Sequence, residues 1–303
     1  MQFIRTTPET VVRSPAVRLA FATVLLLPLS AALAACGSDS TPADGGTSGA
    51  SCPTGEGPPL VLVSSGSEPF CMDKTEVSRA DYAKFLASAP ATGKGECMGR
   101  KPAAARADCS TRLPACSGAN CDRLPQTCID YCDAQTYCEW AGKTLCGTAD
   151  GKMLTSAQIP DTWQNVWSRA CRNKKSPSDP GTKYSFGNDA SFDACNIGDR
   201  PGTGCSRPAD ACTPLESGSL ATCHGVGAYE GIYDLGGNVR EYVYGVVTDE
   251  NGNKRASVFG GDYRAYIKDQ PQVFSCEGAD GISGDLIDHT ESFIGFRCCA
   301  TVR

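Results

Sequence analysis

The sequence predicts a single exported domain that combines short helices with short strands, contains much irregular chain and is held together by disulfides. Three observations indicate this architecture. The first 35 residues resemble an export signal, the chain has 19 cysteines, and 33 glycines with 19 prolines interrupt its periodic segments. An even number of cysteines remains once Cys36 is set aside, which in an exported protein favours disulfides over free thiols.

Residues 1–35 predict a lipoprotein signal peptide. Three arginines precede a mostly apolar run over residues 19–35, whose length suits an export signal better than a membrane span of about 20 apolar residues. The run ends in small residues directly before Cys36, which resembles the lipobox of bacterial lipoproteins. We therefore expect Cys36 to be lipidated and to anchor the protein in a membrane. A plain secretory signal followed by a coincidental cysteine is the alternative.

The residues after the signal predict a tethered domain. Residues 36–50 comprise the lipidated cysteine and a stretch of small and polar residues, which predicts a flexible linker. Residues 51–303 form the predicted domain, with no internal repeat. Because Gly37, and not aspartate, follows the anchor, nothing indicates retention in the inner membrane. We expect a location in the cell envelope, on the outer membrane of a Gram-negative bacterium.

Charge and histidine content exclude several functions. The net charge is −6, so the chain lacks the basic surface of a nucleic-acid-binding protein. The two histidines, His224 and His289, argue against a histidine-built metal centre, and we expect both at the surface. A zinc site of Cys128, Cys132 and Cys138 is an alternative that the spacing and the oxidising compartment disfavour.

The N-terminal part of the domain predicts a strand pair and a helix. Residues 61–63 and 70–72 are short apolar runs around a Gly/Ser turn, which is typical of strands. Ser78 is the expected N-cap of a helix, because apolar residues follow it at helical spacing. The Cys-rich, polar residues 89–127 predict an irregular loop held by disulfides.

Two further helices are expected in the middle of the chain. Thr127 with Asp130 resembles a capping box, and the helix it opens would end near Ala141, with Gly142 as the residue after the cap. Another helix is expected after Pro160. Its apolar stripe, which we interpret as core packing, comprises Trp163, Val166, Trp167 and Ala170.

Residues 246–248 and 256–259 predict a β-hairpin. They flank residues 249–253, which contain Asn251-Gly252, and Asn-Gly between β-rich runs favours a tight hairpin turn. The acidic start of the same segment also resembles a calcium loop. The hairpin is the favoured interpretation.

Several segments occur in the order and spacing of one known family across residues 60–300. Gly231–Tyr242 resembles the motif GLYDMxGNVWEW, Phe259–Tyr263 resembles RGGSY, and Gly295–Cys298 resembles GFRC. The chain thereby resembles the formylglycine-generating enzyme, or sulfatase-modifying factor, family, in a Cys-rich lipoprotein form like those of myxobacteria. The other matching segments are residues 70–78, 137–143, 167–171, 184–188 and 194–197.

The resemblance implies an α+β fold, the formylglycine-generating-enzyme-type variant of the C-type-lectin-like fold, with little regular secondary structure. It also implies two disulfides that tie N-terminal helices to C-terminal strands. Proximity to the same elements suggests two more. The implied pairs are Cys138–Cys298 and Cys171–Cys276, and the suggested pairs are Cys146–Cys299 and Cys52–Cys71.

Calcium is the second implication of the resemblance. Carboxylate and carbonyl oxygens are the ligands that this hard cation prefers, and a turn without an ion is the alternative. A second site would begin at two residues whose further ligands we do not assign. The first site comprises Asp234, Gly237, Val239 and Glu241, and the second begins with Asn196 and the Ile197 carbonyl.

Copper is not expected. Enzymes of the family oxidise a sulfatase cysteine with oxygen and Cu(I), which requires two soft thiolate ligands. The matching positions are Ala265 and Gln270, so we assign no catalytic residue. Neighbouring polar side chains are candidates for a cleft, with a structural ion pair as the alternative. These residues are Arg240, Asp262, Tyr263 and Arg264.

The sequence therefore favours a pseudoenzyme: a non-catalytic binding or structural module that is anchored to a membrane. Its ligand would be a protein or a glycan, on the analogy of its fold. The first alternative is an oxygen-dependent oxidase of the formylglycine-generating type with a rearranged site. The second is a partner protein within an envelope complex.

Overall fold

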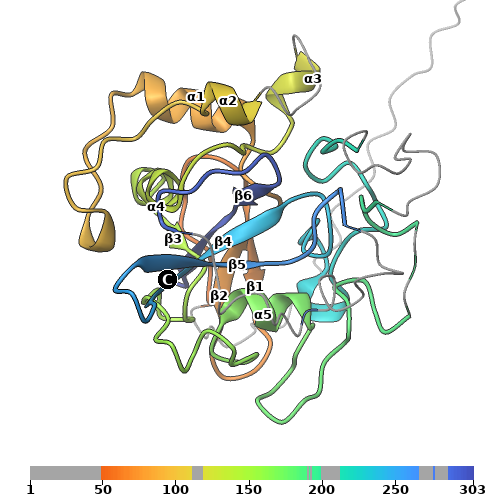
Figure 1. The fold of residues 1–303 in the computed structure, drawn as a ribbon. Helices are drawn as coiled ribbons and strands as arrows, with labels where there is room; N and C mark the ends of the chain where they lie inside the picture. The colour runs from red at the N-terminus through yellow and green to blue at the C-terminus, as the bar shows by residue number, and fades with distance from the viewer. Residues whose placement is uncertain are drawn as a thin grey trace, which may run out of the picture. The chain divides into compact units, whose positions relative to one another are not determined.

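A four-stranded sheet and a three-stranded sheet form the framework of the protein (Figure 1). The computed structural model describes residues 49–110, 119–189, 191, 193–198, 212–265, 276 and 286–303. The predicted signal peptide, the predicted lipidation site Cys36 and Gln270 lie outside these residues. The strands are β1 (Leu60–Val63), β2 (Phe70–Asp73), β3 (Thr144–Leu145), β4 (Arg240–Thr248), β5 (Lys254–Phe259), β6 (Ile294–Phe296) and β7 (Cys298–Thr301).

Short helices flank the two sheets. In Figure 1, α1, α2 and α3 lie above the strands and α5 lies below them. Among the described residues, none of the helices has the length and hydrophobicity needed to cross a bilayer. The helices are α1 (Arg79–Ala87), α2 (Ala107–Ser110), α3 (Ala119–Asp122), α4 (Tyr131–Trp140) and α5 (Val166–Cys171), with 3-10 turns η1 (Gly95–Cys97) and η3 (Gly227–Tyr229).

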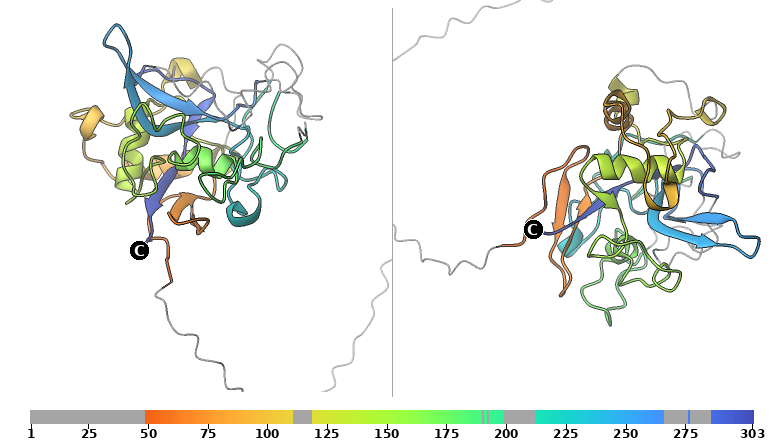
Figure 2. Two further views of the ribbon diagram at one scale, coloured as in Figure 1. Left: turned by 90° about the horizontal axis from the view of Figure 1, so that it is seen from below. Right: turned by 90° about the vertical axis from the view of Figure 1, so that its left-hand side faces the viewer.

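The four-stranded sheet joins the two ends of the domain. Its strand order is β1-β2-β7-β3, and every neighbouring pair is antiparallel. The C-terminal strand β7 therefore lies between two strands from the first half of the chain. Ser51 and Arg303 exchange backbone hydrogen bonds beside this sheet, so the first described residues and the C-terminus are neighbours (Figure 2).

The three-stranded sheet contains the predicted hairpin. β4 pairs with β5 in an antiparallel register that ends at Thr248 and Lys254, and with β6 in parallel. Gly252 has a φ of 79° in the turn, which glycine adopts without steric cost. The Asp249 carboxylate accepts the N–H groups of Asn251 and Asn253. The hairpin is confirmed, and these donors occupy the carboxylate that a calcium loop would need.

The first predicted helix is confirmed and the start of the second differs. The Ser78 hydroxyl oxygen accepts the Asp81 N–H and caps α1. The capping box of α4 comprises Asp130 and Asp133, not Thr127 and Asp130. The reason is Cys128, whose φ of 61° is incompatible with a right-handed helix.

The ends of α4 and α5 follow local signals. Gly142, with a φ of 74°, comes after the last residues of α4 as predicted. Helix α5 begins after Asn165, whose side chain caps it, and not after Pro160. Trp163 therefore precedes the helix, whereas the rest of the predicted stripe is buried in the core as expected.

Seven disulfides join described cysteines. They include the four pairs named above and also staple the Cys-rich segment, as predicted. The zinc alternative is excluded, because its three cysteines are each in a disulfide. The pairs are Cys52–Cys71, Cys97–Cys132, Cys109–Cys128, Cys138–Cys298, Cys146–Cys299, Cys171–Cys276 and Cys195–Cys223.

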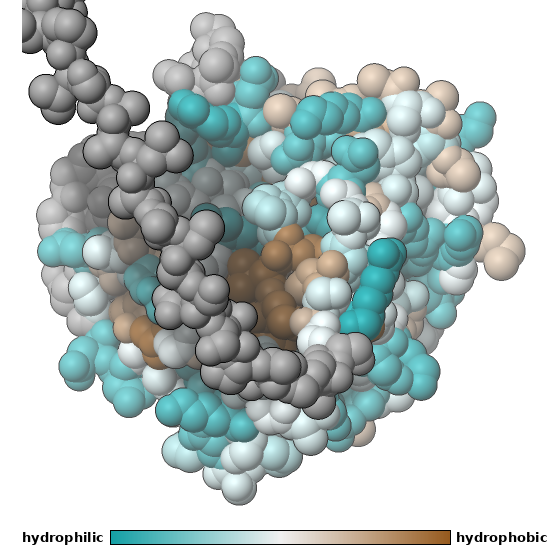
Figure 3. Space-filling model, turned by 180° about the vertical axis from the view of Figure 1, so that it is seen from behind, coloured by the Kyte–Doolittle hydropathy of each residue, from teal (hydrophilic) through white to brown (hydrophobic). Residues whose placement is uncertain are grey.

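Two large hydrophobic clusters form the core. One gathers aromatic side chains of α1, α4 and β6, including Phe85, Tyr137 and Phe296. The other packs Trp167 of α5 against residues of β2 and β5. On the face turned away from the viewer in Figure 1, hydrophobic side chains also gather in a recess (Figure 3). This mixed α/β fold with little regular structure agrees with the predicted fold class.

Candidate functional site

The candidate cleft residues converge on one buried carboxylate. Asp262 follows β5 after Gly260, whose φ of 83° turns the chain closely past Trp167. One carboxylate oxygen of Asp262 accepts a hydrogen bond from Arg240 Nε at 2.9 Å. The other accepts the backbone N–H of Arg264 at 2.9 Å and its Nε at 3.3 Å. The side chain of Asp262 is 2% exposed, so two guanidinium groups neutralise a carboxylate that water does not solvate.

Phe293 completes this cluster. The Arg264 guanidinium carbon lies 3.3 Å from the centre of the Phe293 ring, a cation–π arrangement, and that of Arg240 lies at 5.8 Å. Tyr263 points elsewhere, with its hydroxyl oxygen 3.5 Å from Ser292. Burial raises the pKa of Tyr263. The structure therefore joins Arg240, Asp262 and Arg264 and leaves Tyr263 beside them.

Ala265 is the position that the sequence resemblance matches to the first copper-binding cysteine of the family. It packs against the small hydrophobic cluster that contains Cys195 and Ile197, and its carbonyl accepts the Gly198 N–H at 2.8 Å. Every cysteine in the described part of the chain is in a disulfide. A methyl group and bridged sulfurs offer no thiolate, so the described residues do not fit Cu(I).

A second polar centre lies at the first predicted calcium site. Glu241 accepts two hydrogen bonds from Arg297, from Nη2 and from Nε, each at 2.7 Å, and one from Trp167 Nε1 at 2.8 Å. Both carboxylate oxygens are thus engaged by donors within the protein. Asp234 accepts the Gly218 N–H. Engaged in this way, Glu241 does not fit a calcium ligand.

Glu76 and Asp234 are buried carboxyl groups beside the Glu241–Arg297 pair. Burial, together with repulsion from Asp234 and Glu241, raises the pKa of Glu76 well above its ordinary value. Burial also raises the pKa of Asp234, to about 6. Glu76 accepts Asn238 Nδ2 at 3.0 Å, and its other oxygen has no hydrogen-bond partner among the described residues. Burial therefore favours the protonated form of both carboxyl groups.

The start of the second predicted calcium site lies beside the same network. Asn196 donates its side-chain N–H groups to the Thr213 carbonyl and to Asn238 Oδ1, each at 3.0 Å. Its carbonyl accepts the Asn238 N–H. Within the described ranges, no group of three or more His, Cys, Asp or Glu residues is arranged to hold a metal ion. A calcium ion at Asn196 and Ile197 stays a prediction.

Sequence reasoning missed the partners of these residues. Glu76 and Arg297 lie inside the matched segments but were assigned no role, although burial of a charged residue requires a partner. Phe293 lies outside every matched segment, and no local pattern identifies it. Each of the two histidines forms a local hydrogen bond. His224 contacts the Gly225 carbonyl, and His289 contacts the Glu291 carboxylate.

The comparisons with known proteins agree with this fold. Residues 47–302 match the model of the sulfatase-modifying factor enzyme 1-like domain. The crystal structure of CarF is similar, with 21% identity, a TM-score of 0.52, and coverage of 82% of this chain and 96% of that chain. This likeness concerns the fold.

Two further solved structures are more distant. PvdO from Pseudomonas aeruginosa shares 17% identity and covers 81% of this chain and 89% of its own, with a TM-score of 0.43. Variable protein 1 of Treponema denticola shares 12% identity and covers 81% and 94%, also with a TM-score of 0.43. No curated protein matches the chain. Because the family model covers most of its length, the chain belongs to the sulfatase-modifying factor enzyme 1-like domain family.

Proposed function

We propose that this protein is a cell-envelope lipoprotein whose sulfatase-modifying-factor-like domain binds a ligand and does not catalyse oxidation. The observation that carries the proposal is the lack of thiol donors at the copper position. Ala265 replaces one cysteine and Gln270 the other. Without two soft ligands, Cu(I) has no site at these positions.

The residues around Ala265 support binding over redox chemistry. Asp262 is neutralised by Arg240 and Arg264, and none of these side chains changes oxidation state. Oxidation of a substrate thiol by oxygen needs a group that transfers electrons, which this cluster does not contain. The side chains of Arg240 and Arg264 are 24% and 33% exposed, and they are suited to holding the structure of a surface rather than to activating oxygen.

The disulfides support an extracytoplasmic location. Such bonds form and persist in oxidising compartments and are rare in the cytosol. They also agree with cleavage and lipidation at Cys36, after which residues 37–50 would tether the domain to the outer membrane. The ligand would then reach the domain from outside the cytoplasm.

The test uses the purified mature chain with Cu(I), oxygen and a sulfatase-type Cys-x-Pro-x-Arg peptide. We expect no tight Cu(I) binding and an unchanged peptide mass. The matched control is the double variant A265C/Q270C, which restores both thiols and should gain Cu(I) binding. Conversion of the peptide cysteine to an aldehyde by the unmodified protein would instead establish the rearranged oxidase.

A further inference from the structure

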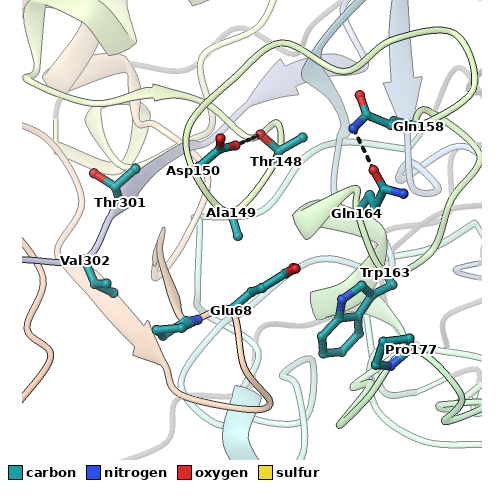
Figure 4. Close-up of a pocket in the computed structure, with 11 residues that line it drawn as sticks. Glu68, Thr148, Ala149, Asp150, Gln158, Trp163, Gln164, Pro177, Thr301 and Val302 are labelled. Atoms are coloured by element: carbon teal, nitrogen blue, oxygen red, sulfur yellow. Dashed lines mark hydrogen bonds between the residues drawn. The ribbon is translucent and has the colours of Figure 1, made fainter.

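A cavity separate from the Asp262 cluster opens beside α5 and the end of β7. Its volume is about 720 Å³, within the range of small-ligand sites in proteins. Figure 4 shows side chains from distant parts of the chain around it. The six polar residues that matter here are Glu68, Asp150, Gln158, Trp163, Gln164 and Thr301.

Trp163 offers this cavity a hydrogen-bond donor. The residue is 7% exposed, and its indole N–H has no acceptor among the described residues. The Arg169 guanidinium carbon lies 3.9 Å from the ring centre. At Gly66, a Cβ would lie 2.6 Å from the ring, so only glycine permits this approach. Contacts with Arg169 and Gly66 fix the position of the ring. Its N–H is the group that remains available to a ligand.

The other polar side chains are fixed and retain hydrogen-bonding capacity. Gln158 Nε2 donates to Gln164 Oε1 at 2.6 Å, which holds both amides and leaves further N–H groups. Glu68 uses one oxygen to accept Arg169 Nη2 at 3.0 Å, and its other oxygen remains an acceptor. The Thr301 hydroxyl has no partner in the described part of the chain.

The charges of the cavity disfavour anions. Two of its lining residues, Glu68 and Asp150, are carboxylates, and their cationic partners Arg169 and Lys152 do not line it. A phosphate or a uronic acid would meet like charge. The remaining lining includes proline, alanine and valine side chains, which suit C–H surfaces. A ligand must therefore be uncharged or cationic, and must both donate and accept hydrogen bonds.

We propose that this cavity binds a neutral saccharide. Hydroxyl groups both donate and accept, which matches a lining that mixes an indole N–H and amide N–H groups with carboxylate oxygens. The C–H faces of a sugar ring match the apolar lining. This inference rests on the proposed binding function and names its site and ligand class.

The experiment is ligand-observed NMR on the full mature chain with cellobiose, maltose and N,N′-diacetylchitobiose, followed by calorimetry of the best probe. Digalacturonate is the acidic comparison. We expect at least one neutral disaccharide to bind with a Kd below about 10 mM and digalacturonate to bind more weakly. Trp163→Phe removes the N–H and should weaken binding about five- to tenfold.

Matched variants keep this test independent of folding. Trp140→Phe is the control, because Trp140 packs against the aromatic cluster of α1, α4 and β6 and does not line the cavity, and it should change the Kd less than twofold. Thr301→Val removes a surface hydroxyl and should weaken binding without lowering the melting temperature. Absence of binding by every neutral probe, or equal binding by Trp163→Phe, would refute the saccharide site. A negative peptide oxidation assay in the same preparation would leave the non-catalytic assignment standing.

Discussion

Arg297 and Glu241 form a two-pronged ion pair in which neither side chain is exposed to solvent. Arg297 is the single residue between β6 of the three-stranded sheet and β7 of the four-stranded sheet. It also donates to the carbonyls of Asp73 and Tyr233. One guanidinium therefore joins both sheets and the loop before β4.

Replacing Arg297 should destabilise the fold strongly. In Arg297→Met the Glu241 carboxylate stays buried without its cation, and breaking a buried ion pair in this way costs about 3–5 kcal/mol. The measurement is the free energy of unfolding from urea titration. The control is Arg123→Met, because the Arg123–Glu216 pair is exposed and such pairs contribute less than about 1 kcal/mol. Equal effects of the two variants would mean that the buried pair is not a structural centre.

The raised pKa values of two carboxyl groups beside the Arg297–Glu241 pair predict that stability falls as pH rises. Burial raises the pKa of Asp234 from 3.8 to about 6 and raises the pKa of Glu76 as well. The folded state therefore binds more protons than the unfolded state between these values, and the free energy of unfolding decreases with pH in that interval. The contribution of each carboxyl group to stability is fully present below its pKa in the unfolded state. It is lost as the pH rises through its pKa in the folded state.

The Glu76→Gln variant tests this pH dependence. It replaces the carboxyl group with a neutral amide of the same shape, so the slope of unfolding free energy against pH should become shallower between pH 4 and pH 7. Burial also raises the pKa of Asp73 to about 6, so part of the slope should remain. The partly buried Asp249→Asn should leave the slope above about pH 5 unchanged, because hydrogen bonds lower the pKa of Asp249 from 3.8 to about 2 and its titration lies below that pH. An unaltered slope in Glu76→Gln would show that Glu76 is ionised in the folded protein.

Local signals predicted much of the fold. Ser78, Gly142 and the Asn251-Gly252 turn are identified by the caps and backbone conformations that these residue types favour, so their positions could be predicted without tertiary information. Trp163 lies before α5 and not within a helix, contrary to the prediction. The reason is that the Asp161 carboxylate accepts hydrogen bonds from the backbone N–H groups of Trp163 and Gln164. This side-chain turn competes with the helix and delays its start.

The candidate sites were predictable only where a motif marked them. The resemblance brought Arg240 and Asp262 together although 22 residues separate them. No such pattern relates Glu241 to Arg297, because burial and pairing of charges are tertiary properties. The cavity at Trp163 was missed for the same reason, since periodicity assigned this tryptophan to a helix stripe in the core.

The long-range disulfides should stabilise more than the short ones. Cys138–Cys298 spans 160 residues and Cys52–Cys71 spans 19. By loop-closure entropy, removal of the first should cost about 5 kcal/mol and removal of the second about 3 kcal/mol. Double Cys→Ala variants of each pair, compared by urea unfolding, measure this difference. A larger loss from the short bridge would show that native packing, and not loop length, sets the contribution.

Substitution of Cys36 should release the protein from its membrane. In Cys36→Ser no thiol is available for acylation, so the chain should lose the lipid and partition into the soluble envelope fraction. Anchoring by acyl chains contributes about 0.8 kcal/mol per buried CH₂ group, and a serine contributes none of it. The measurements are membrane fractionation and the intact mass of the N-terminal peptide. Gly37→Asp is the matched variant: it keeps the lipid and should shift the protein from the outer to the inner membrane. A Cys36→Ser protein that stays in the membrane fraction would mean that another part of the chain provides the attachment.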